Sequence, residues 1–410
     1  MKDPRALLSL DEALLRLVAA AAPRRIAQQE TVSTFDALGR VLAADVKSTL
    51  DVPPADNTSM DGYALRAADV PGPGTVLVVS QRIPAGVVGV PLQPGTAARI
   101  FTGGQVPAGA DAVVMQEQCE ARPGAGLGQV RVDTVPAPGQ WIRRAGEDVR
   151  CGATVLAAGT RLTPQALGMA ASVGAATVPV LRRPRVAVFS TGDELAMPGE
   201  PLKPGAIYNS NRYTLRALLQ AAGCEVQDLG IVPDQLDATR AALRRAAAGS
   251  DLILSSGGVS VGEEDHLKPA VDAEGALDLW QIAMKPGKPL AFGHVGEALF
   301  MGLPGNPVSS FVTFLLAVAP VLRALQGMQT TGPAALSLRA DFDWPRPDRR
   351  REFLRARLNA AGGLELFSNQ SSGVLNSTVW ADGLADIPAG QVVQRGDAVR
   401  FLPMDSLVWR

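Results

Sequence analysis

The sequence predicts a multidomain α/β protein: an α/β domain with a mostly parallel sheet, an inserted β domain, a small mixed domain and a C-terminal β-barrel-like domain. Two patterns support this fold class. Strand and helix patterns alternate from residue 182 to 325, which is typical of a parallel sheet with crossover helices. Short strands separated by Gly and Pro fill residues 64–150 and again 333–410, which indicates two all-β modules.

The domain order follows from helix signals on both sides of the first β module. Ser9-Leu10-Asp11-Glu12 is a capping-box pattern that begins a helix. Thr163-Pro164 begins another, with Thr as the cap and Pro in the first turn. Because similar pieces flank the β module, the simplest topology is an insertion. We expect four domains: 1–46 with 151–178, 47–150, 179–328 and 329–410.

Composition excludes several classes of protein. The chain has 410 residues, of which 47% are hydrophobic and 19% charged, enough for large buried cores. Its 39 basic and 40 acidic residues give a net charge of -1, which argues against a nucleic-acid binder that relies on bulk positive charge. Three separated cysteines and two histidines form neither a disulfide framework nor a zinc site.

The chain also carries no obvious targeting or membrane signal. Its first residues form a charged amphipathic helix pattern and not a signal peptide. No apolar run reaches about 18 residues, so we expect no transmembrane helix. The expected setting is the cytoplasm.

The stretch Asp251–Asp265 contains the first candidate site. A buried strand pattern runs into a loop containing Gly257 and Gly258, and an acidic cluster follows. Glycines let backbone N–H groups approach an anion, and carboxylates beside a phosphate suggest Mg²⁺ between them. The alternative is an ordinary strand-to-helix turn, and the P-loop pattern is absent.

Further loops are expected at the same edge of the sheet, because parallel strands place their carboxyl ends together. A stiff cationic turn, Lys285-Pro286-Gly287-Lys288-Pro289, lies between them in the chain. Together they describe a site for a phosphorylated or oxyanionic ligand with a divalent cation. The loops are Ser190–Glu194, Asp234, Gly257–Asp265 and Pro304–Ser310.

Four polar stretches in the β modules are notable, and two of them have two alternative interpretations. Asp51–Tyr63 is a ligand-facing loop or a linker with turn residues. Thr102-Gly103-Gly104 presents a hydroxyl and amides, whereas Arg143–Asp148 is most simply a solvated hairpin edge. Asn369–Gly373 closes over a ligand or is a hairpin turn.

These residues resemble one known family, the molybdopterin molybdenumtransferases of molybdenum-cofactor synthesis, which includes the E domain of gephyrin. The resemblance covers nearly the whole chain in the right order. The matching motifs are NTSMDGYA (57–64), RIFTGG (99–104), PAGADAVVMQE (107–117), RRAGEDV (143–149), FSTGDEL (189–195), SSGGVSVGEED (255–265), KPGKP (285–289), GLPGNPVSS (302–310) and NQSSG (369–373).

The resemblance implies an elongated homodimer of four-domain subunits, with the active site between the α/β domain of one subunit and the inserted β domain of the other. It implies that adenylylated molybdopterin and molybdate react, with Mg²⁺ required, to give molybdenum-loaded molybdopterin and AMP. The molybdopterin adenylyltransferase and acceptor molybdoenzymes are the implied protein partners. Neither nucleic acid nor a membrane is expected as a partner.

The resemblance also implies roles for individual residues. Asp61 and Thr102 would reach the site from the neighbouring subunit, and Asp234 and Asp265 resemble the Mg²⁺ ligands. The implied catalytic residues are Asp61, Thr102, Asp148, Glu194, Lys285 and Lys288. The implied ligand-binding residues are Ser256, Gly257, Gly258, Val259, Ser260, Pro304, Pro307, Ser309, Arg350 and Ser371.

Within this set, Lys288, Ser309, Arg350 and Ser371 or Ser372 resemble the molybdate-binding residues. The assignment of Arg350 competes with its neighbours Arg349 and Arg351. Two positions depart from the family pattern. His266 stands where relatives often have an aromatic residue, and Asn209 where an acidic residue also occurs.

Two other functions fit parts of the pattern. A scaffold protein would keep the core and lose the acidic and lysine residues, which are all present here. An adenylyltransferase shares the α/β domain, but this reading leaves both β domains without a role. The sequence distinguishes neither molybdate from tungstate nor the acceptor molybdoenzyme.

Overall fold

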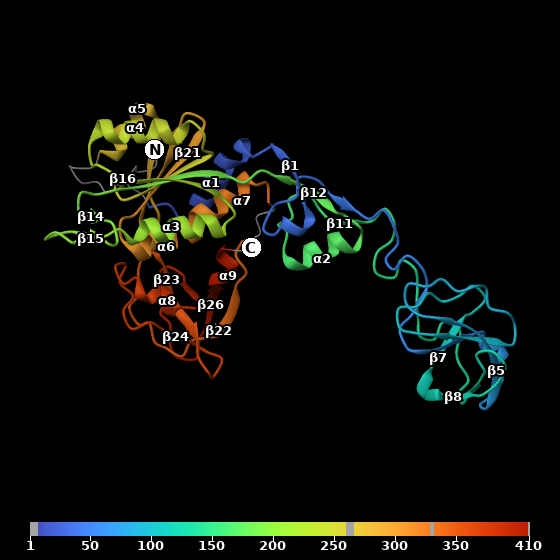
Figure 1. Cartoon of the computed structure of the whole chain (residues 1–410). Helices are drawn as coiled ribbons and strands as arrows, with labels where there is room; N and C mark the ends of the chain where they lie inside the picture. Colours follow the sequence, from blue (N-terminus) through green and yellow to red (C-terminus); the bar gives the residue numbers. More distant parts are fainter. Residues whose placement is uncertain (1–6, 260–265, 329–331, 409–410) are drawn as a thin grey trace.

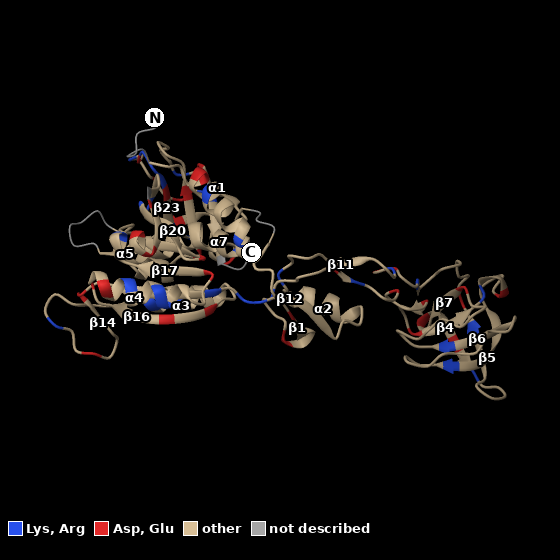
Figure 2. Ribbon diagram, turned by 90° about the horizontal axis from the view of Figure 1, so that it is seen from above, with Lys and Arg blue, Asp and Glu red and all other residues tan. Residues whose placement is uncertain are grey.

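The chain folds into an elongated molecule in the computed structural model, which describes residues 7–259, 266–328 and 332–408 (Figure 1). An α/β body and a C-terminal β domain lie together at one end. A slender stalk connects them to the inserted β domain at the opposite end (Figure 1). Basic and acidic residues are interspersed along the ribbon at both ends, in keeping with the small net charge (Figure 2).

The α/β body contains a six-stranded sheet in the order β16-β13-β17-β21-β20-β18. The first four strands are parallel. β20 pairs antiparallel with β21, and β18 pairs antiparallel with β20, so β20 alone of the six strands runs in the opposite direction and the expected mostly parallel sheet is confirmed. The strands are β13 (Arg185–Thr191), β16 (Glu225–Val232), β17 (Leu252–Ser256), β18 (Gly275–Gln281), β20 (Pro289–Val295) and β21 (Ala298–Leu303). A short pair, β14 (Leu195–Ala196) and β15 (Ile207–Tyr208), projects beside the sheet.

Sequence analysis missed the antiparallel pair β18 and β20, because Gly and Pro interrupt the strand pattern there. Gly275 pairs with Val295, and a Cβ on Gly275 would lie 1.9 Å from the carbonyl oxygen of His294. The glycine is therefore needed for the two strands to approach each other.

Helices cover both faces of this sheet. On one face, α4 (Leu236–Ala247) and α5 (Leu267–Glu274) pack against Phe189 and Phe300. On the other face lie α3 (Ser210–Ala221) and a continuous helix from residue 307 to 325. That helix comprises α6 (Pro307–Thr313), a π-helical segment (Phe314–Val318) and α7 (Ala319–Leu325).

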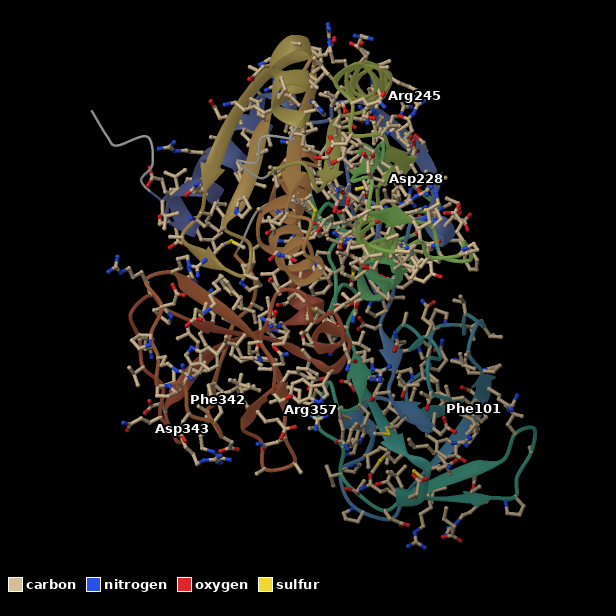
Figure 3. The ribbon with its side chains drawn as sticks, turned by 90° about the vertical axis from the view of Figure 1, so that its left-hand side faces the viewer. Phe101, Asp228, Arg245, Phe342, Asp343 and Arg357 are labelled. Carbon is tan, nitrogen blue, oxygen red and sulfur yellow. The ribbon has the colours of Figure 1, made fainter. Side chains whose placement is uncertain are left out.

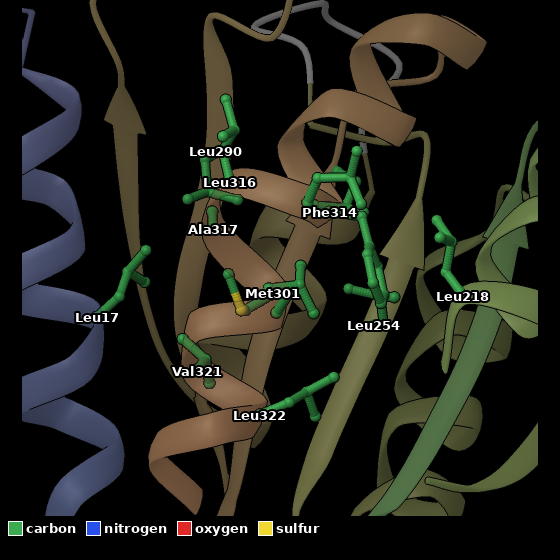
Figure 4. Close-up of a cluster of buried hydrophobic side chains, with 14 of the residues drawn as sticks. Leu17, Leu218, Leu254, Leu290, Met301, Phe314, Leu316, Ala317, Val321 and Leu322 are labelled. Carbon is green, nitrogen blue, oxygen red and sulfur yellow. The ribbon is translucent and has the colours of Figure 1, made fainter. Parts of the chain in front are cut away.

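The continuous helix explains one unexpected property of the chain. By length and composition it is apolar enough to cross a membrane, with a mean hydropathy of 1.9 over its best window. However, 78% of that window is buried inside the protein. Its side chains Phe314, Leu316 and Val321 pack with Met301 of the sheet (Figure 4), so the apolar composition is that of a core helix.

The first helix, α1 (Leu10–Ala21), begins as expected, because Ser9 Oγ accepts a hydrogen bond from Glu12 N at 3.1 Å. Its packing differs from the expected domain division, which placed residues 1–46 in the stalk. Leu10, Ala13 and Leu17 belong to the hydrophobic core of the α/β body, where Leu17 faces the helix 307–325 (Figure 4). The amphipathic pattern predicted a buried face but not its partner. The other expected boundaries stay predictions.

The stalk has a small core of its own. Its two short antiparallel sheets pair β1 with β12 and β2 with β11, and Ala166 and Ala170 of α2 pack against them. The elements are β1 (Gln29–Ser33), η2 (Thr34–Asp36), β2 (Val46–Lys47), β11 (Thr154–Leu156), α2 (Pro164–Ser172) and β12 (Thr177–Leu181). At the junction with the α/β body, Arg182 donates two hydrogen bonds of 2.7 Å to the Asp251 carboxylate.

The inserted β domain is a six-stranded sheet in the order β7-β4-β6-β5-β9-β8, in which only β5 and β6 are parallel neighbours. The strands are β4 (Gly62–Leu65), β5 (Thr75–Ile83), β6 (Thr96–Ile100), β7 (Ala112–Met115), β8 (Cys119–Arg122) and β9 (Gln129–Val132). A two-stranded neck of β3 (Asn57–Thr58) and β10 (Ile142–Arg143) leads into it.

The C-terminal β domain is built on a third six-stranded sheet, in the order β19-β23-β25-β26-β22 with β24 paired to β23. Its elements are β19 (Met284–Lys285), β22 (Leu336–Arg339), β23 (Arg351–Leu358), β24 (Leu364–Leu366), α8 (Asn376–Trp380), β25 (Gly383–Ile387), β26 (Ala398–Pro403) and α9 (Met404–Val408). Because β19 comes from the lysine turn, this sheet connects the two domains directly.

The core packing yields a stability prediction. Phe314→Ala should lower the free energy of unfolding of the α/β body by about 3–5 kcal/mol, because Phe314 is fully buried and its loss leaves a cavity. Phe35→Ala is the control: Phe35 is 93% exposed, and the change should stay within about 0.5 kcal/mol. Urea unfolding followed by circular dichroism measures both. Equal effects of the two substitutions would contradict the described packing.

Candidate functional site

The largest concentration of predicted site residues surrounds a cavity of about 560 Å³ at the carboxyl ends of the parallel strands. Glu194, Ser256, Gly257 and Pro307 all line it. The full lining is Thr191, Glu194, Leu195, Ile207, Tyr208, Asn209, Ser210, Asn211, Ser256, Gly257, Gly305, Asn306, Pro307 and Gly373. Most of these residues are polar or glycine, as suits a charged ligand.

The glycine turn is built for close backbone approach. Gly257 and Gly258 have φ angles of +92° and +68°, in the left-handed region that favours glycine. A Cβ on Gly257 would lie 2.6 Å from the Thr191 carbonyl oxygen, and one on Gly258 would lie 2.9 Å from Thr191 Oγ1. The next residue, Val259, is buried and lies against Gly302 of β21.

One side chain fixes the three loops around the cavity. Asn211, in the first turn of α3, donates from Nδ2 to Ser256 Oγ at 2.8 Å and to the Gly305 carbonyl oxygen at 2.7 Å. It thereby ties the start of α3 to the loops after β17 and β21. The cavity is consequently a pre-formed feature of the α/β body.

Two helices begin at this cavity, since Asn209 and Ser210 start α3, and Asn306 and Pro307 start the helix that runs to residue 325. The unpaired N–H groups of a helix N-terminus carry partial positive charge and attract anions. No Lys or Arg side chain lines the cavity among the described residues, so these helix starts are its positive groups.

The predicted metal ligands are only partly described. Asp234 follows β16, and its backbone N lies 3.5 Å from Asp193 Oδ1 in the loop that carries Glu194. Asp193 and Glu194 on one loop and Asp234 on the next therefore place three acidic residues near one another. Asp265 and Ser260 lie outside the described residues. Within the described ranges, no group of three or more His, Cys, Asp or Glu residues is arranged to hold a metal ion.

A second cavity, of about 270 Å³, adjoins the C-terminal β domain and contains Lys285 and Ser371. The other residues lining it are Pro286, Trp344, Glu352, Leu354, Arg355 and Gln370. Lys285 Nζ lies 2.9 Å from Glu352 Oε1 in an ion pair without hydrogen-bond geometry, and 3.4 Å from Asp348 Oδ2. Part of its positive charge is therefore balanced within the protein.

Arg355, which is fully buried beside this cavity, is not among the residues predicted from the sequence. Its guanidinium donates to Ser377 Oγ at 3.1 Å and to the carbonyl oxygens of Phe353 and Ser371, and no described carboxylate lies within 4 Å of it. Burial lowers its pKa to about 10. A buried cation without a carboxylate is costly unless the site normally holds an anion.

The predicted residue Arg350 is placed differently. It forms a two-pronged contact with Asp348, at 3.1 and 3.0 Å, and does not line either cavity. The hydrogen bonds from Arg350 hold the pKa of the Asp348 carboxyl well below its usual range. The signal in the sequence that could have indicated Arg355 is a charged residue between the apolar Leu354 and Ala356.

The lysine turn and the 369–373 loop both contact α6. A Cβ on Gly287 would lie 2.5 Å from Thr313 Oγ1 and 3.6 Å from the Ser309 carbonyl oxygen, so this turn packs directly on the helix. Val308 N donates to the Ser372 carbonyl oxygen at 3.0 Å. Ser309 is buried, Pro304 is buried just after β21, and Lys288 is exposed.

The remaining predicted residues lie in or near the inserted β domain. Thr102 donates from its backbone N and its Oγ1 to Asp61 Oδ1, both at 2.7 Å. These two bonds, the backbone bond first, lower the pKa of the Asp61 carboxyl. Nearby, the guanidinium carbons of Arg82 and Arg99 lie 4.5 and 4.6 Å from the centre of the Phe101 ring. Phe101 is labelled in Figure 3 and marks the inserted β domain there.

Asp148 is exposed in the neck, where its backbone N donates to the Val52 carbonyl oxygen at 3.0 Å. Within one chain, Asp61, Thr102 and Asp148 are not brought to the glycine turn. The stalk separates them from it, and Figures 1 and 2 both show the inserted β domain at the far end of the molecule.

Family models match three parts of the chain. Residues 8–174 match the MoeA N-terminal region (domain I and II), 187–324 a probable molybdopterin binding domain, and 337–404 the MoeA C-terminal region (domain IV). The α/β domain that contains the larger cavity thus matches a probable molybdopterin binding domain, and the regions before and after it match MoeA domains.

Curated relatives extend over most of the chain. A molybdopterin molybdenumtransferase of Haemophilus influenzae is 41% identical over 344 residues, covering 83% of this chain and 84% of the relative. One from a Nostoc species is 38% identical over 386 residues, with coverage of 90% and 87%. The chain belongs to the MoeA family of molybdopterin molybdenumtransferases.

A solved structure agrees with this assignment. The crystal structure of a molybdopterin biosynthesis MoeA protein from Pyrococcus horikoshii has a TM-score of 0.83 and 31% sequence identity. The match covers 97% of this chain and 100% of that one.

The Asp61–Thr102 pair yields a prediction about titration. Thr102→Val should raise the pKa of Asp61 towards its ordinary value, because the side-chain donor is lost while the stronger backbone donor remains. Carboxyl ¹³C chemical shifts followed against pH measure it. Thr58→Val is the control, since Thr58 Oγ1 donates to the Met60 carbonyl oxygen and not to Asp61. An unchanged Asp61 titration in Thr102→Val would contradict the bond.

Proposed function

We propose that the protein inserts molybdenum from molybdate into adenylylated molybdopterin, with Mg²⁺-dependent release of AMP. The relatives' activity supports this reaction class. One observation carries the proposal: two cavities suited to anions adjoin the same polar loop. Gly373 lines the larger cavity and Ser371 the smaller. Such an arrangement suits the transfer of an oxyanion's metal to a neighbouring dinucleotide.

In this proposal the larger cavity binds the dinucleotide. The Gly257–Gly258 turn and the two helix starts bind its phosphate groups, and the fixed loops orient it. Val259, Pro304 and Pro307 support these loops, and Ser260, which follows Val259 in the sequence, is proposed as a further ligand-binding residue. Breaking a pyrophosphate needs neutralisation of charge more than a special nucleophile.

Mg²⁺ fits the chemistry of this edge. Asp234, with Asp265 as the second ligand, offers the oxygen donors that Mg²⁺ prefers, and such sites usually have few protein ligands. The metal, when bound, supplies positive charge against the phosphate oxygens. Glu194, on the neighbouring loop, lies where it orients the reacting group or a water molecule.

The smaller cavity binds molybdate, a tetrahedral dianion. Arg355 provides a buried guanidinium without a carboxylate, and Ser371 and Gln370 provide polar groups beside it. Lys285 and Lys288 bring further positive charge from the stiff turn, next to Ser309. Arg350, which is held by Asp348, acts through that carboxylate on Lys285.

We also propose that the working unit is a homodimer. Asp61, Thr102 and Asp148 lie in the domain at the far end of the stalk, so a site containing them and the glycine turn takes them from a second subunit. The proposed setting is the cytoplasm, and the proposed protein partners are the adenylyltransferase and the acceptor molybdoenzymes.

The reaction can be tested directly. With adenylylated molybdopterin and molybdate, the protein should release AMP and load molybdenum only when Mg²⁺ is present. Asp234→Asn should abolish Mg²⁺-dependent release, because it removes a charged ligand. Asp237→Asn, on the first turn of α4, is the control. AMP is measured by chromatography. Full activity after chelation of divalent cations would contradict the Mg²⁺ assignment. Absence of AMP release by the wild type would contradict the proposed function.

A subunit-mixing experiment tests the shared site. Asp61→Asn and Lys288→Ala should each be inactive alone. When they are unfolded, mixed in equal amounts and refolded together, activity should return to about a quarter of the wild-type rate, because half of the pairs are mixed and each has one intact site. If both residues acted within one chain, mixing would restore nothing. That result would refute the arrangement.

The oxyanion cavity yields a prediction that distinguishes two arginines. Arg355→Lys should raise the half-saturating molybdate concentration roughly ten- to a hundredfold, because a compact ammonium does not replace the planar fork and its contacts. Arg350→Lys should raise it much less, since Arg350 does not line the cavity. AMP release titrated with molybdate measures both. If Arg350→Lys raised the half-saturating molybdate concentration more than Arg355→Lys did, Arg350 and not Arg355 would be the molybdate-binding arginine.

A further inference from the structure

A buried amide lies at the start of α3, where this helix meets two loops. Asn211 is 9% exposed and lines the larger cavity. Its Nδ2 donates to Ser256 Oγ at 2.8 Å and to the Gly305 carbonyl oxygen at 2.7 Å. Because a carbonyl oxygen only accepts hydrogen bonds, these contacts fix which end of the amide is nitrogen.

Neither helix packing nor helix capping accounts for this side chain. Asn211 lies one turn before Leu215, which is fully buried in the core, so an apolar residue would suit packing at this position. The N-cap is Asn209, whose Oδ1 accepts a hydrogen bond from Arg212 N at 3.1 Å. A buried amide is costly unless its hydrogen bonds are made, so we expect the two bonds of Asn211 to have a use of their own.

The two acceptors belong to loops that border the larger cavity. Ser256 ends β17, directly before the Gly257–Gly258 turn, and Gly305 lies in the loop between β21 and α6. The two loops are adjacent, because Gly257 N donates to the Leu303 carbonyl oxygen at 3.1 Å and a Cβ on Gly305 would lie 4.0 Å from Gly257 Cα. Asn211 therefore joins the start of α3 to both loops, across 45 and 94 residues of chain.

The same two bonds determine which atoms face a ligand in this cavity. An oxygen lone pair that pointed at a phosphate group would repel it. The Gly305 carbonyl oxygen is directed towards the Asn211 amide, although Gly305 itself is exposed at the cavity. Ser256 Oγ also accepts from this amide, so the hydroxyl keeps its hydrogen, and not that lone pair, for other contacts.

We propose that Asn211 is a positioning residue for the dinucleotide: it holds the loops after β17 and β21 in place and turns the Gly305 carbonyl oxygen away from the bound phosphate groups. Asn211 acts through these loops and does not need to touch the ligand itself. The inference rests on the proposed function and assigns the pre-formed shape of the larger cavity to one amide. A loop that is already ordered lowers the cost of binding.

Two variants at this position and one control test the proposal. Asn211→Ala removes the amide and both hydrogen bonds. Asn211→Asp keeps the shape but accepts hydrogen bonds only, so it repels the Gly305 carbonyl oxygen instead of holding it. Asn359→Ala is the matched control: Asn359 Nδ2 donates to Asp341 Oδ2 at 2.7 Å and also joins two segments of the chain, but the residue lines neither cavity. Thermal unfolding checks that each variant is folded.

The first measurement needs no ligand. Amide hydrogen exchange of the full-length protein, followed by mass spectrometry, should be faster in the loop of residues 303–306 in both Asn211 variants, because this loop loses its tie to α3. Asn359→Ala should exchange like the wild type there. An unchanged exchange rate of this loop in Asn211→Ala would overturn the positioning role.

The second measurement compares the two cavities. Asn211→Ala should weaken the binding of adenylylated molybdopterin roughly tenfold by calorimetry, because the loop must be ordered again when the ligand binds. Asn211→Asp should weaken it further, because the misdirected carbonyl oxygen and the added carboxylate both oppose a phosphate. The half-saturating molybdate concentration should stay within about twofold of the wild type, since neither loop lines the smaller cavity.

The outcomes separate this inference from the proposed function. Wild-type affinity for the dinucleotide in Asn211→Ala would overturn the inference and leave the proposed reaction intact. Parallel losses for the dinucleotide and for molybdate would also overturn it, because they would indicate general damage to the domain. Failure of the wild type to bind adenylylated molybdopterin would refute the proposed function itself, and this result is distinct because it depends on no variant.

Discussion

The contact between the Gly257–Gly258 turn and Thr191 determines most of the geometry of the α/β body's functional edge. Thr191 ends β13, and the turn follows the neighbouring parallel strand β17. Since there is no room for a Cβ on either glycine, the turn lies directly on the Thr191 backbone. Asn211 then ties Ser256 of β17 to the loop before α6. The cavity exists because these strand ends meet so closely.

Helix α6 connects this edge to the C-terminal domain. It contacts the lysine turn through Thr313 and the 369–373 loop through Val308. The lysine turn in turn contributes Lys285 to the C-terminal sheet, where it pairs with Glu352. Two domains that follow each other in the sequence consequently share one helix as a common wall. The placement of the two cavities side by side follows from that shared element.

The helix starts and the parallel sheet could be predicted from the sequence, because both depend on residues that are close together in the chain. Ser9 and Thr163 predicted helix starts correctly, and the strand–helix alternation predicted the parallel sheet. The partner of an amphipathic face is not local, so α1 was assigned to the stalk although it packs on the helix 307–325. Likewise, the family resemblance implied Arg350, one of three consecutive arginines, whereas the strand register of β23 buries Arg355. Hydrogen bonds that join distant loops, such as those of Asn211, become visible only in three dimensions.

The neck of the inserted β domain has a topological consequence. Val52 and Val149, where the chain leaves and re-enters the stalk, are hydrogen-bonded neighbours, with Val52 N donating to the Val149 carbonyl oxygen at 2.7 Å. The two chain segments that connect the stalk to the inserted β domain therefore lie as close together as the two ends of a hairpin loop. A whole domain occupies the place of a turn, and its length, orientation and surface are free to diverge during evolution without disturbing the framework that carries it.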